Sequence, residues 1–121
     1  MARAAIYARV STGEQSTEQQ VVALREAAAR MGLDVVQVVE ETGSGAKNDR
    51  PGLQRVLDDA RRGKLDVVLV WKLDRFGRSA LDLLANIRDL DAAGVRFVAT
   101  SQGIDIRPGG DVHQASPTVL R

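Results

Sequence analysis

The chain has 121 residues, a size typical of one domain with its own hydrophobic core. Its 17 Lys and Arg against 16 Asp and Glu give a formal charge of +1, which lacks the overall basic excess of many nucleic-acid-binding proteins. The absence of cysteine excludes disulfides and thiolate metal sites, and the single histidine, His113, excludes a multi-histidine zinc site. Because the sequence has neither a signal-peptide pattern nor an apolar run of membrane-spanning length, we expect a soluble, cytoplasmic protein with no membrane partner.

Short apolar runs alternate along the chain with segments of helical periodicity. The runs are too short for helices and almost continuously hydrophobic, as expected of strands that are covered on both faces. This alternation predicts an α/β domain, with a mostly parallel sheet of four to five strands and helices on both faces. In chain order, strands are expected at residues 4–8, 35–39, 67–71 and 95–99, and helices between residues 16 and 32, 51 and 63, and 79 and 94.

Each predicted helix has residues that favour its ends. Ser16 and Gln19 form a capping-box pattern before the first helix, and Pro51 lies near the start of the second. Ser79 opens the third helix, with Asp82 three residues further on. A glycine follows each helix, as is typical of a helix C-terminus: Gly32, Gly63 and Gly94.

The last part of the chain has a different composition. From Pro108 onward there are two glycines, two prolines and no sustained period. We therefore expect a folded domain over residues 1–106, followed by an atypical, loose tail over residues 107–121.

Polar loops follow the first three predicted strands. In an open parallel sheet, ligands bind beyond the carboxyl ends of the strands, so these loops are expected to share one edge of the sheet. Together they carry hydroxyl groups, an acid and several arginines. The three loops are residues 9–15, 42–50 and 72–78.

Arginines that converge on a hydroxyl group suit a phosphate, because the guanidinium binds two phosphate oxygens at once and stays charged. In phosphoryl transfer, most of the catalytic task is positioning and neutralisation of the charge that builds up on oxygen. Nearby arginines would also favour the alkoxide of Ser11, since no histidine is available to take its proton. Asp74 is suited both to orienting an arginine and to carrying a proton, and the sequence leaves the two roles open.

Each of these features also has an ordinary structural explanation. Residues 11–12 can be a loop hydroxyl pair, and the charges of residues 72–78 can pair with one another in solvent. Residues 43–45 are typical of a flexible turn and lack the Gly-Lys-Ser/Thr ending of a nucleotide-binding loop. Tyr7 and Trp71, at strand positions, are more typical of a core than of a base-stacking surface. Composition and periodicity therefore predict an α/β domain with an anion site and go no further.

Three longer strings, in order and in register, resemble the catalytic domain of the serine recombinases, the resolvase/invertase family. The agreement extends from residue 3 to about residue 106. The matching strings are YARVST at residues 7–12 with Gln15 and Gln20, SG at 44–45 with DRPGL at 49–53, and KLDRFGR at 72–78 with GID at 103–105.

The resemblance implies a site-specific recombinase that cuts and rejoins double-stranded DNA through a 5′-phosphoserine intermediate, with Ser11 as the nucleophile. Arg9, Arg75 and Arg78 would surround the scissile phosphate, and Arg50 would assist them. Family members need neither a metal ion nor a nucleotide cofactor, because the phosphoserine bond retains the energy for rejoining. They act as homodimers that join into tetramers. The supporting residues would be Asp74, Gln15, Gln20, Ser44 and Lys72.

After Asp105 the sequence departs from the family pattern. Family members continue into a long helix, which carries another active-site arginine and much of the dimer interface, and then into a separate DNA-binding domain. Pro117 and the pair of glycines at 109–110 disfavour that helix here. We therefore expect weakened oligomerisation and no complete recombination by this chain alone. Two alternatives stay open at this point, an inactive remnant that acts only as an interaction or weak DNA-binding module, and an unrelated phosphate-sensing domain.

Overall fold

The computed structural model describes residues 2–11, 17–43, 51–77, 79–109 and 112–114. Its helices and strands come in the order that the sequence predicts, with two short strands added after the last helix. The elements are β1 (Arg3–Ser11), α1 (Glu18–Arg30), β2 (Asp34–Gly43), α2 (Pro51–Arg61), β3 (Val67–Val70), the 3-10 turn η1 (Leu73–Arg75), α3 (Ala80–Ala92), β4 (Arg96–Ala99), the 3-10 turn η2 (Thr100–Gln102), β5 (Ile104–Ile106) and β6 (Val112–Gln114).

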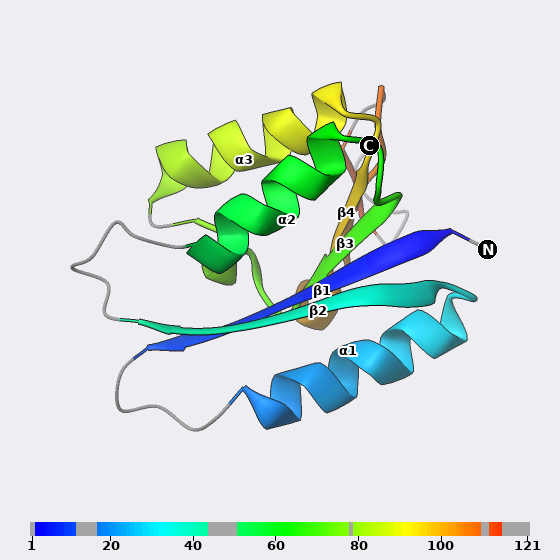
Figure 1. Ribbon diagram of the computed structural model, residues 1–121, viewed down its shortest axis with the longest axis vertical. Coiled ribbons are helices and arrows are strands. Elements are labelled where there is room, and N and C mark those ends of the chain that lie inside the picture. The colour runs from blue at the N-terminus through cyan, green and yellow to red at the C-terminus, as the bar shows by residue number, and fades with distance from the viewer. Residues whose placement is uncertain (1, 12–16, 44–50, 78, 110–111, 115–121) are drawn as a thin grey trace.

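The described part of the chain forms three layers (Figure 1). Its six strands make one sheet in the order β2-β1-β3-β4-β5-β6. The strands β1 to β4 are parallel to their neighbours, whereas β5 and β6 are added antiparallel at one edge. Helix α1 covers one face of the sheet, and α2 and α3 cover the other. The predicted class, a mostly parallel α/β sheet with helices on both faces, is therefore confirmed.

The central strand β1 explains why the apolar runs are almost continuous. Ala4 and Ile6 pack with α1 on one side of the sheet, and Ala5 and Tyr7 pack with α2 on the other. All four are fully buried, because successive side chains of a strand point to opposite faces and both faces are covered here. Burial on this scale stabilises the fold by about 25 cal/mol for each Å² of apolar surface removed from water.

The helix ends agree with the sequence signals at the start of α3 and at the glycines, whereas α1 is capped at Thr17 instead of at the predicted Ser16. The Ser79 hydroxyl accepts a hydrogen bond from the backbone N–H of Asp82 at 3.2 Å, as predicted for the start of α3. Helix α1 is preceded by Thr17, and the predicted cap at Ser16 lies outside the described residues. The glycines that follow the helices adopt the left-handed conformation that favours glycine, with φ of 72°, 76° and 77° at Gly32, Gly63 and Gly94.

Two details differ from the sequence prediction. Strand β3 ends at Val70, and Trp71 lies outside it and is half-buried instead of belonging to the core. Within the segment predicted as a loose tail, Val112–Gln114 form β6, which pairs antiparallel with β5. The domain boundary near residue 106 stays a prediction. Among the described residues, no helix is both long and apolar enough to span a membrane.

Candidate active site

The first three strands bring their carboxyl ends to one edge of the sheet. Because β1 lies between β2 and β3 and is parallel to both, the prediction that three polar loops leave from the same edge is confirmed. The last residue of β3, Val70, pairs with Tyr7, while β1 continues to Ser11 opposite Gly43 of β2. The end of β1 therefore extends beyond β3, and η1, which follows β3, contacts β1.

Arg9 is a buried cation at this edge. It lies on β1 two residues before Ser11, and only 6% of it is exposed. The side chain of Gln20, on the first turn of α1, bonds both backbone groups of Arg9: Nε2 donates to its carbonyl oxygen at 3.0 Å, and Oε1 accepts from its N–H at 3.3 Å. Strand β3 ends opposite Tyr7 and does not reach Arg9. The side chain of Gln20 therefore bonds the backbone groups of Arg9 in place of a neighbouring strand. Gln20, which the sequence resemblance indicated as a supporting residue, is thus hydrogen-bonded to Arg9 in the structure.

Arg75 is held beside β1 by the turn η1 and by the residue that follows it. Phe76 is fully buried, and its ring lies 6.0 Å from that of Tyr7 and 4.9 Å from that of Phe97. Its carbonyl oxygen accepts a hydrogen bond at 2.8 Å from Nδ2 of Asn86, which is itself buried on α3. An aromatic side chain packed on two sides and a buried backbone hydrogen bond leave this part of the chain little freedom, so the backbone of Arg75 is fixed by the core.

Asp74 and Lys72, also named from the sequence, lie on the outer side of the same turn. The Asp74 side chain is 77% exposed, whereas that of Arg75 is only 19% exposed. Oδ1 of Asp74 lies 3.9 Å from Nε of Arg75, a separation at which a solvated ion pair contributes little. Lys72 is exposed. Asp74 is therefore close enough to influence the orientation of Arg75, and its suitability as a proton carrier stays a prediction.

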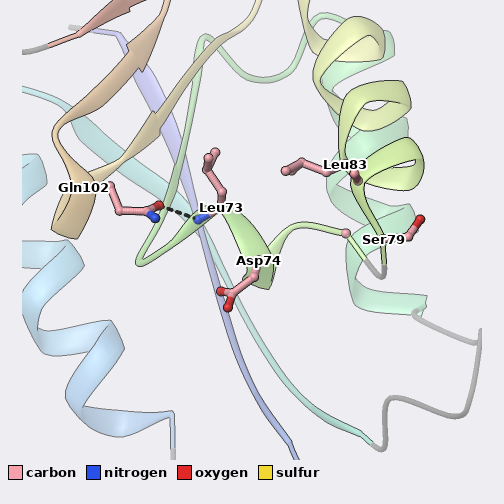
Figure 2. Close-up of a pocket in the computed structure, with 7 residues that line it drawn as sticks. Leu73, Asp74, Ser79, Leu83 and Gln102 are labelled. Atoms are coloured by element: carbon pink, nitrogen blue, oxygen red, sulfur yellow. Dashed lines mark hydrogen bonds between the residues drawn. The ribbon is translucent and has the colours of Figure 1, made fainter.

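A hollow of about 360 Å³ lies between η1 and the start of α3 (Figure 2). Leu73 and Leu83 line it, and Ser79 lies at the start of the helix beside it. The side chain of Gln102 accepts a hydrogen bond from the N–H of Leu73 at 2.8 Å, which connects η1 to η2, the turn that follows β4. Asp74 is the charged group among the described lining residues, and its negative charge disfavours a phosphate in the hollow.

Some of the predicted residues fall where the structure gives no description. Gln15, Ser44, Arg50 and Arg78 lie outside the described residues, and of Ser11 only the backbone is described. Conversely, sequence reasoning missed one acid at this edge. Glu41 of β2 is the register neighbour of Arg9 on β1. The signal that could have found it is its place at the polar carboxyl end of a predicted strand.

Comparison with known proteins identifies the family. A family model described as "Resolvase, N terminal domain" matches residues 4–115. A DNA-invertase of Escherichia phage P1 is 40% identical over 99 residues, which are 82% of this chain and 49% of the relative. The transposon Tn3 resolvase of Escherichia coli is 38% identical over 114 residues, 94% of this chain and 57% of the relative. The chain thus spans about half the length of the curated relatives that it matches.

Solved structures agree with the sequence relatives. The N-terminal catalytic domain of TP901-1 integrase matches with a TM-score of 0.76 and 38% identity, over 85% of this chain and 80% of that one. A resolvase family site-specific recombinase from Streptococcus pneumoniae matches with a TM-score of 0.75 and 30% identity, over 87% of this chain and 76% of that one. The sequence resemblance, the sheet order and these matches agree, and the chain belongs to the serine recombinase family, to the part described as the resolvase N-terminal domain.

Proposed function

We propose that the chain supplies the catalytic domain of a site-specific DNA recombinase that cuts and rejoins DNA through a phosphoserine intermediate. Ser11 is the nucleophile, and Arg9, Arg75, Arg78 and Arg50 bind and neutralise the scissile phosphate. The observation that carries this proposal is the meeting, at one edge of the sheet, of the end of β1 with the buried Arg9 and with the turn that bears Arg75. Membership of the family supports it.

The reaction exchanges one phosphodiester for another. The Ser11 Oγ attacks the phosphorus, the bond from phosphorus to the 3′ oxygen breaks, and the serine becomes linked to the 5′ end. The serine hydroxyl loses a proton and the departing 3′ oxygen gains one, so the numbers of ester bonds and charges are unchanged. Rejoining is the reverse attack by a 3′ hydroxyl group. The phosphoserine bond itself conserves the energy, and the step as written needs neither a nucleotide nor a metal ion.

The arginines act mainly by neutralising the negative charge of the scissile phosphate. Negative charge accumulates on the phosphate oxygens in the transition state, and guanidinium groups fixed in place before the reaction stabilise it without reorganisation. A guanidinium as buried as that of Arg9 gains most from an anion, because few water molecules compete for its hydrogen bonds. Asp74, Lys72, Gln15, Gln20 and Ser44 then support this set.

Double-stranded DNA is the proposed partner, together with further copies of the chain. Family members assemble as dimers that join into tetramers, and we expect this assembly to be weakened here, because the sequence after Asp105 departs from the family pattern. The formal charge of +1 means that contact with DNA rests on the local arginines, so binding by this chain is expected to be weak and to fade with added salt. The alternative, a non-catalytic interaction module, has less support, because residues 3–106 carry the catalytic strings of the family and the most similar relatives bear the names of enzymes.

A denaturing gel tests the proposal. The 121-residue chain, at high concentration and low salt, is incubated with a pool of nicked DNA duplexes randomised around the nick, so that cleavage becomes irreversible. We expect a DNA adduct that survives denaturation, disappears in Ser11→Ala and persists in Thr12→Ala, the matched hydroxyl control. Circular dichroism establishes that both variants fold. An adduct that persists in Ser11→Ala, or no adduct from the unaltered chain, contradicts the proposal.

A further inference from the structure

The turn η1, which carries Arg75, is too short to fix its own position. Two hydrogen bonds close it, from the N–H of Arg75 to the carbonyl oxygen of Lys72 at 3.0 Å and from the N–H of Phe76 to that of Leu73 at 2.9 Å. A single 3-10 turn has poor hydrogen-bond geometry, and it lacks the length that makes a helix cooperative. The position of Arg75 therefore depends on the contacts that hold the turn from outside.

The start of the turn is bonded to η2, the turn that follows the neighbouring strand β4. The backbone N–H of Ser101 donates to the carbonyl oxygen of Trp71 at 3.0 Å, and its hydroxyl group donates to the same oxygen at 2.6 Å. Oε1 of Gln102 accepts from the N–H of Leu73 at 2.8 Å, a bond drawn in Figure 2. These bonds begin where the pairing of β3 with β4 ends. The loops that follow two parallel strands are therefore joined to one another.

The end of the turn is bonded to α3. Nδ2 of Asn86 donates to the carbonyl oxygen of Phe76 at 2.8 Å, and only 7% of Asn86 is exposed. Asn86 lies on the face of α3 that packs the apolar Leu83, Ile87 and Leu90 against the core. A buried amide on an apolar face costs free energy unless it is hydrogen-bonded. Its bond to the turn therefore accounts for an asparagine at this position.

A close backbone contact seats the same end of the turn on α3. A Cβ atom at Gly77 would lie 2.7 Å from the backbone N and from Cα of Leu83, so no side chain fits at residue 77 unless the two segments move apart. Arg75 lies two residues earlier, its side chain is 19% exposed, and its turn contacts β1. The turn is thus held at its start by η2 and at its end by α3, with Arg75 between the two attachments.

We propose that Gln102 and Asn86 are positioning residues for DNA cleavage: by holding the two ends of η1, they fix Arg75 relative to the end of β1. This inference rests on the function proposed above. A guanidinium stabilises a transition state fully only if it is already in place, and a displacement of about 1 Å can slow a reaction roughly a hundredfold. Neither residue belongs to the three loops that carry the proposed phosphate ligands, so both act through the turn.

Four variants of the full chain test the two attachments. Gln102→Leu removes the acceptor for the Leu73 N–H, whereas Gln102→Glu keeps an acceptor oxygen. Asn86→Leu removes the donor to Phe76 and fills the buried space with an apolar side chain. Gln54→Leu is the matched control, because Gln54 is exposed on α2. Circular dichroism establishes that the variants fold, and Asn86→Leu carries the test if Gln102→Leu does not fold.

Two quantities are measured on each variant, the rate of adduct formation on the nicked DNA pool as a function of DNA concentration and the NMR shift of the backbone group that loses its partner. For Gln102→Leu we expect a rate roughly tenfold lower at saturating DNA, an unchanged half-saturating concentration and an upfield shift of the Leu73 amide proton. Asn86→Leu should lower the rate by a similar factor and shift the Phe76 carbonyl carbon. Gln54→Leu should change neither quantity.

Gln102→Glu tests rescue by a second acceptor. Its carboxylate can still accept from the Leu73 N–H, so the amide proton should stay downfield and the rate should lie within about threefold of that of the unaltered chain. The comparison is made at saturating DNA, where the added negative charge does not lower the rate through weaker binding.

A double-mutant cycle tests whether the effect passes through Arg75. Arg75→Lys keeps a charge on the turn but loses the two-point contact with phosphate. Without that contact the exact position of the turn matters less, so Gln102→Leu should slow Arg75→Lys by less than about threefold, although it slows the unaltered chain about tenfold. A merely structural role of Gln102 would slow both by the same factor.

The outcomes distinguish the two proposals. Equal factors in the two backgrounds, a normal rate in Gln102→Leu with a shifted Leu73 amide, or a loss of rate that Gln102→Glu does not restore overturns the positioning role and leaves the proposed function standing. If the unaltered chain forms no Ser11-dependent adduct while its Leu73 amide is hydrogen-bonded, the proposed function fails, and the role of Gln102 and Asn86 in cleavage fails with it.

Discussion

The two ends of β1 hold an arginine each, in opposite surroundings. At the amino end, Arg3 donates to the carboxylate of Asp66 from its backbone N–H at 2.7 Å and from Nε at 3.0 Å, and both side chains are nearly half-exposed. At the carboxyl end, Arg9 is almost fully buried beside the end of the strand. The first arginine closes an ion pair on the surface, and the second is kept in a site of low solvent access. The comparison is consistent with the proposal above, in which the carboxyl edge of the sheet binds the phosphate, whereas the ion pair at the amino edge stabilises the fold.

Other arginines of the described residues follow the pattern of Arg3. Arg61 of α2 bonds Asp58 on its own helix and Asp89 of α3, each at 2.8 Å. Arg96 of β4 donates to both oxygens of Asp105 on β5, at 2.8 and 2.6 Å. Hydrogen bonding to Arg96 lowers the pKa of Asp105, and hydrogen bonding to Arg3 lowers that of Asp66. In each of these pairs a structural carboxylate binds the arginine at close range.

The largest expected effect concerns catalysis, and it separates Arg75, at the proposed phosphate site, from the acid-paired arginines. The acid-paired arginines are Arg3, Arg61 and Arg96. Arg75→Lys keeps the charge but loses the planar, two-point contact with phosphate, so cleavage should slow roughly a hundredfold, equivalent to about 3 kcal/mol of transition-state stabilisation. Arg61→Lys, in the acid-paired group, is the control and should cleave at the normal rate. Both are compared at saturating DNA by the rate of adduct formation. Similar rates for the two variants would break the distinction between catalytic and structural arginines.

A smaller effect is expected where the core supports the catalytic edge. Asn86→Ala removes the hydrogen bond to the Phe76 carbonyl oxygen and leaves this buried acceptor without its donor, which should cost about 1–3 kcal/mol of unfolding free energy. Gln54→Ala, at an exposed position of α2, is the control and should change stability little. Urea unfolding at neutral pH measures both. If Asn86→Ala is as stable as the control, the turn that bears Arg75 is not held in the way described.

The smallest expected effect concerns the ion pair between Arg96 and Asp105 and the way its contribution to stability changes with pH. Because the pKa of Asp105 is lower in the folded state than in the unfolded chain, its ion pair stabilises the fold at neutral pH, and this contribution is lost as pH falls below about 4. Asp105→Asn should therefore reduce the unfolding free energy at pH 7 by about 1 kcal/mol or less, and the difference from the unaltered chain should shrink at pH 3. Glu26→Gln, on the exposed side of α1, serves as the control for charge. A difference that grows at low pH would contradict the sign of this effect.

Much of the fold follows from local signals. Short, almost continuous apolar runs and helical stripes located the four parallel strands and three helices, because those elements form a sheet that is covered on both faces. Strands β5 and β6 span only three residues each, too few for a pattern, and they depend on pairing along the edge of β4 and on the bonds from Arg96 to Asp105. Trp71 was expected in the core because it was predicted as the last residue of a strand, and it is half-buried because β3 ends before it.

The sequence predicted which edge of the sheet carries the candidate site, but it did not predict the hydrogen bonds among the residues there. The rule that ligands bind beyond the carboxyl ends of parallel strands located Arg9 and Arg75, and the structure describes Gln20 in contact with Arg9. The hydrogen bonds of Glu41 could not be deduced, because they join it to the N–H of Gly52, eleven positions away, and to the hydroxyl group of the buried Tyr7. Only the packing of α2 against β2 reveals such contacts.

Peptide mapping of the DNA adduct tests the central claim most directly. After nuclease treatment, trypsin should release residues 10–25 as one fragment, because cleavage follows Arg9 and Arg25 and no lysine or arginine lies between them. The fragment contains four hydroxyl residues, namely Ser11, Thr12, Ser16 and Thr17, so tandem mass spectrometry is needed to locate the modification. The account predicts a nucleotide joined through its 5′ phosphate to Ser11, and a free 3′ hydroxyl group on the other DNA end. A nucleotide on another residue, or a 3′-phosphoryl link to the protein, would contradict it.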